Sequence, residues 1–348
     1  MADTLVPAED LDAILGRSGN LLEELSGQRL FLTGCTGFFG LWLLATIAAF
    51  NRDRKDPVRV VALSRDPDVF AKRYPVLWAP WLTLVGGDIR SFTLPRGRFD
   101  AVIHGATTSA RETFNQQDPL QKFDIVAGGT RQLLAQLPQG ARLLYLGSGA
   151  CYGRQPDDLL NIPEDYPGAP DPDTPNSALG IGKRAAEFYC RYFAGERGLD
   201  VRIARCFTFY GPHLPLDIHY AVGNFIRDAM MGRPVVVTGD GTPERSYLYA
   251  ADLVSWLLTL LVRGEPGGIY NVGDDRAVSI AALADAVASQ FGVPLNIAGE
   301  PGGAPVSRYV PDVARARALG LDAWTPLGEG ITRMANHARG FPDYYNTA

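Results

Sequence analysis

Short runs of Val, Ile, Leu and Ala alternate along the first part of the chain with longer stretches in which apolar residues recur at helical spacing. The short runs predict buried strands at 29–33, 58–63, 82–85, 100–105, 142–147 and 200–206. The longer stretches predict helices at 38–51, 118–137 and 177–197. Strands that are apolar along their whole length and separated by helices indicate a parallel sheet covered on both faces. The expected fold class is therefore α/β, with a doubly wound parallel sheet.

The pattern differs on either side of this region. Leucines and one isoleucine recur at helical spacing over 9–26, interrupted near Gly16 and Gly19, which predicts one or two short amphipathic helices. After residue 206, prolines and glycines separate much shorter segments. This change predicts a smaller lobe interleaved with the last elements of the sheet.

Three glycines follow the first predicted strand, at positions 34, 37 and 40 of Thr33-Gly-Cys-Thr-Gly-Phe-Phe-Gly40. In this place glycines permit a tight turn, a close backbone approach to a pyrophosphate, and close packing of the next helix on the strand. The N-terminus of that helix offers unpaired N–H groups to phosphate oxygens. The motif predicts a dinucleotide site.

The end of the second predicted strand carries Ser64 and Arg65. An NAD site usually has an acidic residue here to bind the ribose 2′-hydroxyl, whereas a hydroxyl residue and an arginine suit a 2′-phosphate. The sequence thus favours NADP over NAD, although Asp66 is close enough for a shift of register to reverse the preference. After the third strand, Asp88 and Ile89 lie where a carboxylate can bind the adenine amino group.

These motifs, and others in the same order, resemble those of the extended short-chain dehydrogenase/reductase family. The similarity is to its NAD-dependent nucleotide-sugar epimerases and dehydratases, such as UDP-glucose 4-epimerase, and covers residues 28–330. The further motifs are Val102-Ile103-His104-Gly105-Ala106, Ser148 to Tyr152-Gly153, Gly182-Lys183-Arg184-Ala185-Ala186-Glu187, Arg205-Cys206-Phe207, Tyr210-Gly211-Pro212, Gly239-Asp240-Gly241, Arg245-Ser246-Tyr247 and Tyr270-Asn271-Val272-Gly273. The resemblance implies a Rossmann-type sheet with a smaller C-terminal substrate-binding lobe, an NAD or NADP cofactor, and a nucleotide-sugar substrate.

The resemblance also implies roles for individual residues. Lys183 matches the lysine that binds the nicotinamide ribose, and Ser148 matches the hydroxyl residue that binds the reacting sugar hydroxyl. Substrate-binding positions carry over to Ser148, His219, Asn224, Arg245 and Arg308. Cofactor-binding positions carry over to Gly34, Thr36, Gly37, Phe38, Phe39, Gly40, Ser64, Arg65, Asp88, Ile89, Ala106 and Lys183.

One position departs from the family at the catalytic centre. The family's proton-transferring tyrosine lies four residues before the lysine, and this chain has Leu179 there. Leucine has no exchangeable proton, and general acid–base groups typically contribute about 10²–10⁴-fold to rate. Three interpretations are open. A surrogate donor acts from elsewhere (Tyr152, Cys151 or His219), a different base epimerises a substrate that already carries a ketone, or the protein is a catalytically impaired homologue that only binds its ligands.

A second departure follows Ser148. Relatives that eliminate water carry Asp-Glu there and the decarboxylases carry a glutamate, whereas this chain has Gly149 and Ala150. The expected reaction is therefore epimerisation or 4-keto reduction through a keto-sugar intermediate, with dehydration or decarboxylation as the alternative.

The expected organisation follows from these assignments. Residues 1–27 form an N-terminal helical extension, and 28–206 form the NAD(P)-binding domain with a contribution from 245–275. Residues 207–244 and 276–348 form the substrate-binding lobe. Helices 118–137 and 177–197 match those that pair between subunits in relatives, so the resemblance implies a homodimer.

Composition narrows the classes of partner. The net charge of −5 argues against a nucleic-acid-binding protein, because neutralising a phosphate backbone needs a concentrated basic face. The longest apolar stretch, 38–50, is too short to cross a bilayer, which predicts no membrane association. The four cysteines show no disulfide spacing and the first residues do not form a secretory leader, so a cytoplasmic location is expected. No His/Cys cluster predicts a metal site.

Overall fold

The structure is a computed structural model that describes residues 5–300, 302, 306–342 and 345. Parts of two predicted units lie outside the described residues: 1–4 of the N-terminal extension, and 301, 303–305, 343–344 and 346–348 of the substrate-binding lobe.

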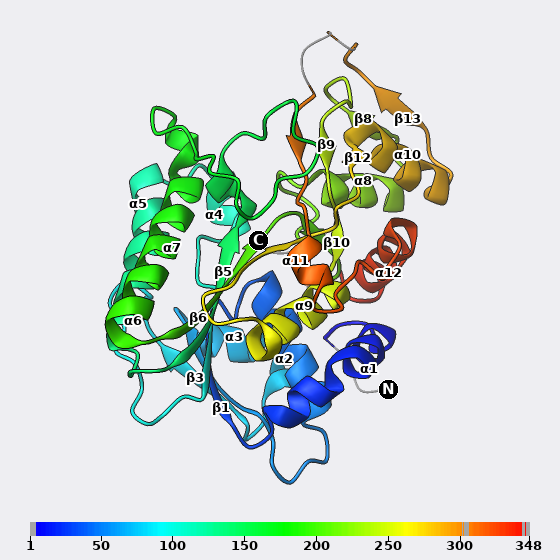
Figure 1. The fold of residues 1–348 in the computed structure, drawn as a ribbon. Coiled ribbons are helices and arrows are strands. Elements are labelled where there is room, and N and C mark those ends of the chain that lie inside the picture. Colours follow the sequence, from blue (N-terminus) through cyan, green and yellow to red (C-terminus); the bar gives the residue numbers. More distant parts are fainter. Residues whose placement is uncertain (1–4, 301, 303–305, 343–344, 346–348) are drawn as a thin grey trace.

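Its centre is a parallel sheet with strand order β11-β6-β5-β4-β1-β2-β3 (Figure 1). The strands are β1 (Arg29–Thr33), β2 (Arg59–Ser64), β3 (Leu82–Gly86), β4 (Ala101–His104), β5 (Arg142–Ser148), β6 (Asp200–Cys206) and β11 (Ile269–Val272). Six of these strands lie within a residue of the predicted segments, and the order from β3 to β6 is that of a Rossmann-type sheet. The predicted fold class is confirmed.

Helices cover both faces of this sheet (Figure 1). On one face lie α5 (Pro119–Phe123), α6 (Gly129–Gln136) and α7 (Ala178–Arg197), and on the other lie α1 (Ala8–Glu24), α2 (Phe38–Phe50) and α9 (Ala250–Arg263). Two buried apolar clusters correspond to these two faces. Shorter helices in the same half are α3 (Pro67–Arg73), α4 (Ala110–Phe114), η1 (Pro75–Leu77), η3 (Gly149–Tyr152) and η4 (Pro175–Ser177).

The predicted helix 118–137 is wrong in one respect, because it is not one regular α-helix. A π-helical turn, η2 (Asp124–Gly128), separates α5 from α6. The Thr130 hydroxyl donates to the carbonyl oxygen of Val126 at 2.6 Å and thereby offers that carbonyl a partner outside the regular ladder. His104 contacts the same hydroxyl at 2.9 Å. The irregular turn therefore lies against the end of β4.

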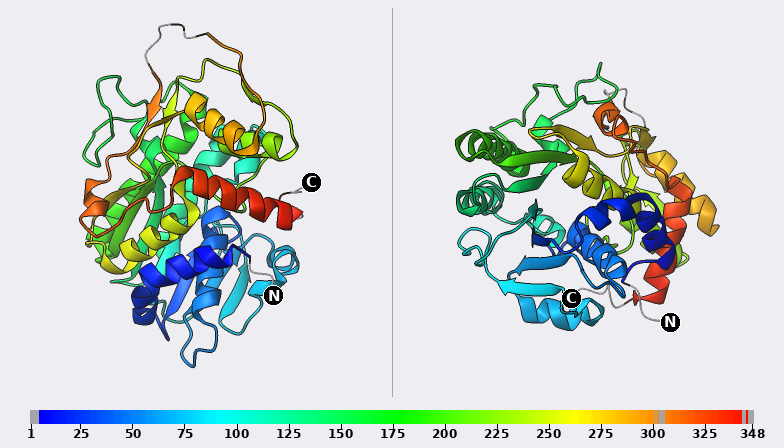
Figure 2. Two further views of the ribbon diagram at one scale, coloured as in Figure 1. Left: turned by 90° about the vertical axis from the view of Figure 1, so that its right-hand side faces the viewer. Right: turned by 60° about the horizontal axis from the view of Figure 1, so that its bottom comes forward.

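The N-terminal helix is continuous and tied to distant parts of the chain. Gly16 and Gly19 do not interrupt α1, which is helical throughout. Open space surrounds both positions. Arg17 pairs with buried Asp252 of α9 at 2.7 Å. Buried Asp10 accepts hydrogen bonds from Tyr249 and from Arg333 of α12 (Leu327–Gly340). Helices α1 and α12 lie side by side in Figure 2.

Most of the remaining elements lie beyond the carboxyl ends of the strands (Figure 1). They comprise helices α8 (Ala221–Met230), α10 (Ile280–Phe291) and α11 (Ala314–Arg317), and strands β7 (Phe209–Tyr210), β8 (Val235–Val237), β9 (Glu244–Arg245), β10 (Leu248–Tyr249), β12 (Val278–Ser279), β13 (Leu295–Ile297) and β14 (Arg308–Tyr309). The strands pair as β10-β7, β12-β9-β14 and β13-β8. These small sheets connect the loops that lie at the carboxyl edge of the main sheet.

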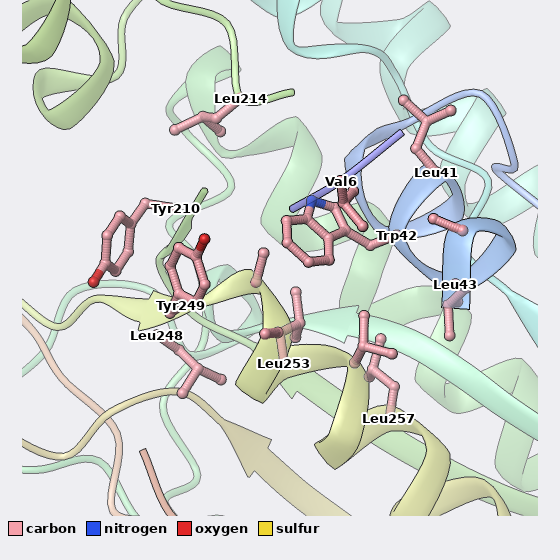
Figure 3. Packing of buried hydrophobic residues seen from close by; sticks show 14 of the residues in the cluster. Val6, Leu41, Trp42, Leu43, Tyr210, Leu214, Leu248, Tyr249, Leu253 and Leu257 are labelled. Carbon is pink, nitrogen blue, oxygen red and sulfur yellow. The ribbon is translucent and has the colours of Figure 1, made fainter. Parts of the chain in front are cut away.

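Buried aromatic residues connect helix α2 to these loops (Figure 3). Trp42 of α2 packs edge-on against Tyr249, with ring centroids 6.1 Å apart. Its indole N–H donates to the carbonyl oxygen of Pro212 at 2.9 Å. The N-terminal end of α2 is thus held at a fixed position relative to the loop that begins at Gly211.

Candidate functional site

A cavity of about 540 Å³ lies at the carboxyl edge of the sheet. Its walls come from the turn after β1, the loops after β4 and β5, helix α7 and the loop 211–220. In open α/β sheets this edge is the usual place for a ligand. The size of the cavity is in the range of small-molecule sites.

The glycine turn forms one wall of the cavity and is closely packed from behind. A Cβ atom on Gly34 would lie 2.5 Å from the carbonyl oxygen of Gly105, and one on Gly40 would lie 2.4 Å from that of Gly34. Gly34 also has φ +78°, a conformation that favours glycine. Side chains are therefore excluded at both positions.

The same turn leaves the N-terminus of α2 open. Gly37 precedes the helix and supplies no side-chain cap to its first N–H groups. Thr36, Gly37, Phe38 and Phe39 line the cavity, whereas Gly40 lies in the packed turn. Unpaired N–H groups and the positive end of the helix dipole suit a diphosphate. The residues present therefore fit the dinucleotide that the sequence motif predicts.

The residues assigned to the adenosine half lie outside the cavity lining. Arg65 pairs with Glu112 of α4 at 2.6 Å, and the Ser64 hydroxyl accepts the N–H of Asp66 at 3.2 Å. Asp88 is paired with Arg90, which lowers the pKa of its carboxyl to about 2.

The residues at two further predicted cofactor positions contact other parts of the protein. Ile89 is buried and packs against Gly129, and the Ala106 N–H donates to the Thr33 hydroxyl at 3.1 Å.

Ser148, Leu179 and Lys183 come together in the cavity wall. Ser148 ends β5, and its hydroxyl accepts the N–H of Ala150 at 3.1 Å. Leu179 and Lys183 lie one turn apart on α7, so their side chains share a helix face. The Lys183 ammonium donates to the Leu146 carbonyl oxygen at 2.8 Å.

Burial determines the electrostatics of this group. Only 5% of Lys183 is exposed, and burial lowers the pKa of its ammonium to about 8, although the nearby Glu187 carboxylate acts in the opposite direction. Glu187 is itself held by Arg205, at 2.7 and 2.9 Å. Lys183 is therefore mostly charged at pH 7 and loses its proton at mildly alkaline pH.

The segment after Ser148 contains no space for a longer side chain. A Cβ atom on Gly149 would lie 2.6 Å from the Tyr309 hydroxyl and 2.8 Å from the Phe207 ring. The two aromatic rings pack against each other at a tilt of 32°, with centroids 4.6 Å apart. Aromatic side chains thus fill the space into which a carboxylate at position 149 would project.

Two of the three proposed surrogate donors do not reach the cavity. The Tyr152 hydroxyl donates to Asn271 at 2.8 Å within the core, and only 1% of that tyrosine is exposed. Cys151 is fully buried, and burial raises the pKa of its thiol to about 12. The remaining candidate, His219, lines the cavity. The structure thus separates Tyr152 from Ser148 and Lys183, although the sequence placed them together.

Three of the predicted substrate-binding residues are likewise not brought to the cavity. The Asn224 amide donates to the Ile218 carbonyl oxygen at 2.7 Å. Arg245 donates to the carbonyl oxygens of Glu244 and Ser307, at 2.7 and 2.9 Å. Arg308 pairs with the Glu244 carboxylate at 2.5 Å. Each of these side chains has a protein partner in this structure.

Several cavity residues gave no usable signal in the sequence. Thr108, Arg111, Phe209 and Tyr220 all line the cavity. Arg111 pairs with Asp217 at 2.9 Å and so connects α4 with the loop 211–220. Tyr220 follows His219 directly, and Phe209 lies two residues after the Arg205-Cys206-Phe207 motif, so only these two could have been indicated by a neighbouring motif.

The described residues show neither a metal-ligand cluster nor a membrane-spanning helix. Between residues 5 and 345, leaving out the undescribed positions, no group of three or more His, Cys, Asp or Glu side chains could hold a metal ion. Within the same part of the chain, no helix has the length and apolar character needed to cross a membrane.

Comparison with known proteins identifies relatives over most of the chain. Residues 30–273 match the model of the NAD dependent epimerase/dehydratase family. UDP-glucuronic acid decarboxylase 5 of Arabidopsis thaliana is 30% identical over 321 residues, which cover 90% of each chain.

Solved structures show the same fold. UDP-glucose 4-epimerase of Thermotoga maritima with UDP-glucose has a TM-score of 0.73 at 22% identity, covering 90% of this chain and 99% of that one. MoeE5 in complex with UDP-glucose and NAD has a TM-score of 0.70 at 27% identity, with the same coverage.

Two glycine variants test the packing of the turn. In Gly40→Ala the new methyl group would lie 2.4 Å from backbone atoms, so the backbone must shift and we expect a loss of at least about 2 kcal/mol in the free energy of unfolding. In Gly37→Ala the nearest atom is 3.5 Å away, and we expect a loss below about 1 kcal/mol. Urea unfolding measures both, and NADH fluorescence titration should show weaker binding in each. Equal stability of the two variants would contradict the packing described for the turn.

The buried charge of Lys183 makes a prediction about pH. Its pKa is about 8 in the folded chain against an ordinary value of 10.5, so the unfolded chain binds this proton more tightly and folding becomes more favourable as pH rises through this interval. Relative to Lys183→Met, the wild-type free energy of unfolding should therefore increase by about 1 kcal/mol between pH 7 and 9. Exposed Lys72 provides the control, Lys72→Met, for which the difference from wild type should not change with pH. A pH-independent difference for Lys183→Met as well would show that Lys183 is solvated.

Proposed function

The chain belongs to the NAD dependent epimerase/dehydratase family, whose members include enzymes that act on nucleotide sugars, and we propose that it modifies a nucleotide-linked sugar through a keto-sugar intermediate. The proposed reaction is epimerisation or 4-keto reduction. The observation that carries this proposal is the single cavity that joins the glycine turn with Ser148, Leu179 and Lys183. A dinucleotide on the turn and a sugar against Ser148 would then share one cavity.

The roles of the chain's residues follow from their positions. The N–H groups at the start of α2 bind the diphosphate of the dinucleotide, and Lys183 binds the nicotinamide ribose. The nicotinamide, when bound, exchanges a hydride with the sugar carbon. Ser148 orients the reacting oxygen of the sugar, with its own hydroxyl fixed by the Ala150 N–H. Segments 207–244 and 276–348 form the proposed substrate-binding lobe.

The environment of Gly149 supports this choice over dehydration. Elimination of water needs a base and an acid beside the sugar, and Gly149 and Ala150 provide neither. The Tyr309 and Phe207 side chains already fill the adjacent space. No carboxylate can therefore project from position 149 without displacing them.

Decarboxylation is the second candidate, because the curated relative named above is a UDP-glucuronic acid decarboxylase. Oxidation at C4 of a sugar with a C6 carboxylate gives a β-keto acid, which loses carbon dioxide without a separate acid–base pair. The Tyr309 and Phe207 side chains leave no space for a carboxylate at position 149, which argues against dehydration more strongly than against decarboxylation. An impaired homologue that binds both ligands without turnover is the third candidate, since Leu179 cannot transfer a proton.

The cofactor proposal is NAD or NADP. MoeE5, which shares the fold, contains NAD. The preference for NADP that Ser64 and Arg65 suggest would require a 2′-phosphate to take Arg65 from Glu112, which pairs with it at 2.6 Å. Parallel titrations with NADH and NADPH decide between them.

A homodimer is also part of the proposal. Large apolar side chains are exposed on α5 and α7, including Leu120 at 74%, Phe188 at 64% and Tyr192 at 52%. Exposed apolar patches on adjacent helices are typical of subunit interfaces. These are the helices that the resemblance assigns to pairing between subunits.

A panel of UDP-, dTDP-, GDP-, CDP- and ADP-sugars tests the proposed function. We expect one nucleotide class, added with NADH, to raise the melting temperature, because a ligand stabilises the state that binds it. Mass spectrometry of the product distinguishes the reactions: unchanged mass indicates epimerisation, gain of two hydrogens reduction, loss of carbon dioxide decarboxylation, and loss of water dehydration. Ser148→Ala should retain the thermal shift but lose turnover. No shift with any sugar nucleotide would contradict the proposal.

A further inference from the structure

The cavity contains a phenol that the roles above do not use. Tyr220 lines the cavity, and the structure gives its hydroxyl no hydrogen-bond partner among the described residues. The side chain is only partly buried and belongs to the cavity lining. An unbonded hydroxyl in this position is available to a ligand.

Neighbouring groups hold the Tyr220 ring in place. It is the N-cap residue of α8, and its ring lies 4.4 Å from that of His219. His219 in turn stacks on Phe114, with centroids 6.2 Å apart and planes 17° apart. The Arg111–Asp217 pair anchors the preceding part of the same loop to α4. The phenol therefore approaches the cavity from the wall formed by loop 211–220.

Three other proton-bearing groups that line the cavity, Lys183, Cys206 and His219, are less suited to protonate a sugar oxygen. Lys183 is engaged with the Leu146 carbonyl oxygen, and burial raises the pKa of the Cys206 thiol to about 12. Partial burial and the Lys122 charge lower the pKa of His219, so its imidazole is neutral at pH 7 and has no readily lost proton.

We propose that Tyr220 is the catalytic residue that exchanges a proton with the reacting sugar oxygen, in place of the tyrosine that position 179 lacks. This inference rests on the proposed function. In the reducing direction, the carbonyl carbon gains a hydride from NADH or NADPH, and the carbonyl oxygen gains the hydroxyl proton of Tyr220. The C=O π bond is replaced by a C–H and an O–H bond. The phenolate then regains a proton from solvent through the open cavity.

The environment of Tyr220 favours its protonated form. Burial raises the pKa of its hydroxyl, so the phenol carries the proton that the carbonyl oxygen receives.

The test compares variants in the chemical step, followed as the change in nicotinamide fluorescence within one turnover. UDP-glucose with NAD serves as the first probe, and then the sugar nucleotide of the panel that the wild-type protein converts. Tyr220→Phe should slow this step by about 10²–10⁴-fold while the thermal shifts with NADH and with UDP-glucose stay unchanged. Tyr166→Phe, a half-buried tyrosine outside the cavity, is the control and should match wild type.

A second variant separates proton transfer from folding. Leu179→Tyr, introduced into Tyr220→Phe, restores a phenol one turn before Lys183 and should recover at least about tenfold of the lost rate. The inference is overturned if Tyr220→Phe stays within about threefold of wild type, or if His219→Asn alone abolishes the step. It is also overturned if wild type binds both ligands without turnover and only Leu179→Tyr is active, an outcome that leaves the proposed substrate class intact. Absence of binding in every variant would instead refute the proposed function itself.

Discussion

The close approach of backbone to backbone at the end of β1 is the constraint on which the site depends. Three chain segments meet there without intervening side chains: the turn at Gly34, the end of β4 at Gly105, and the start of α2 at Gly40. This contact directs the first turn of α2 towards the cavity with its N–H groups uncapped. The buried contact of Trp42 with Pro212 then holds loop 211–220, whose His219 and Tyr220 line the same cavity as Ser148.

Much of this arrangement could be predicted from the sequence because it depends on local patterns. Apolar runs and glycine spacing are properties of contiguous residues, and they located six of the seven strands of the sheet and the glycine turn. Side chains placed by long-range contacts could not be predicted in this way. Tyr152 follows Ser148 closely in sequence, but its hydroxyl is directed to Asn271, 119 residues further along the chain. The π turn at 124–128 depends on Thr130 and its contact with His104, which no helical periodicity reveals.

Leucine at position 179 changes the chemistry of the whole wall. In the family pattern the lysine acts on a neighbouring tyrosine, whereas here Lys183 faces an aliphatic side chain. Its charge is buried and, among the described residues, hydrogen-bonded only to a backbone carbonyl; the burial accounts for the lowered pKa. Next to Ser148, the space at Gly149 is filled by Tyr309 and Phe207. The family's tyrosine and a carboxylate after Ser148 are thus both missing, and the proposed proton donor, Tyr220, lies on loop 211–220.

A crystal structure of the protein with NADH and UDP at saturating concentration tests the central claim most directly. The account predicts that the cofactor diphosphate lies at the N-terminus of α2, bonded to N–H groups between Thr36 and Phe39, with the nicotinamide facing Ser148. A turn blocked by side chains, or a dinucleotide bound elsewhere, would contradict it.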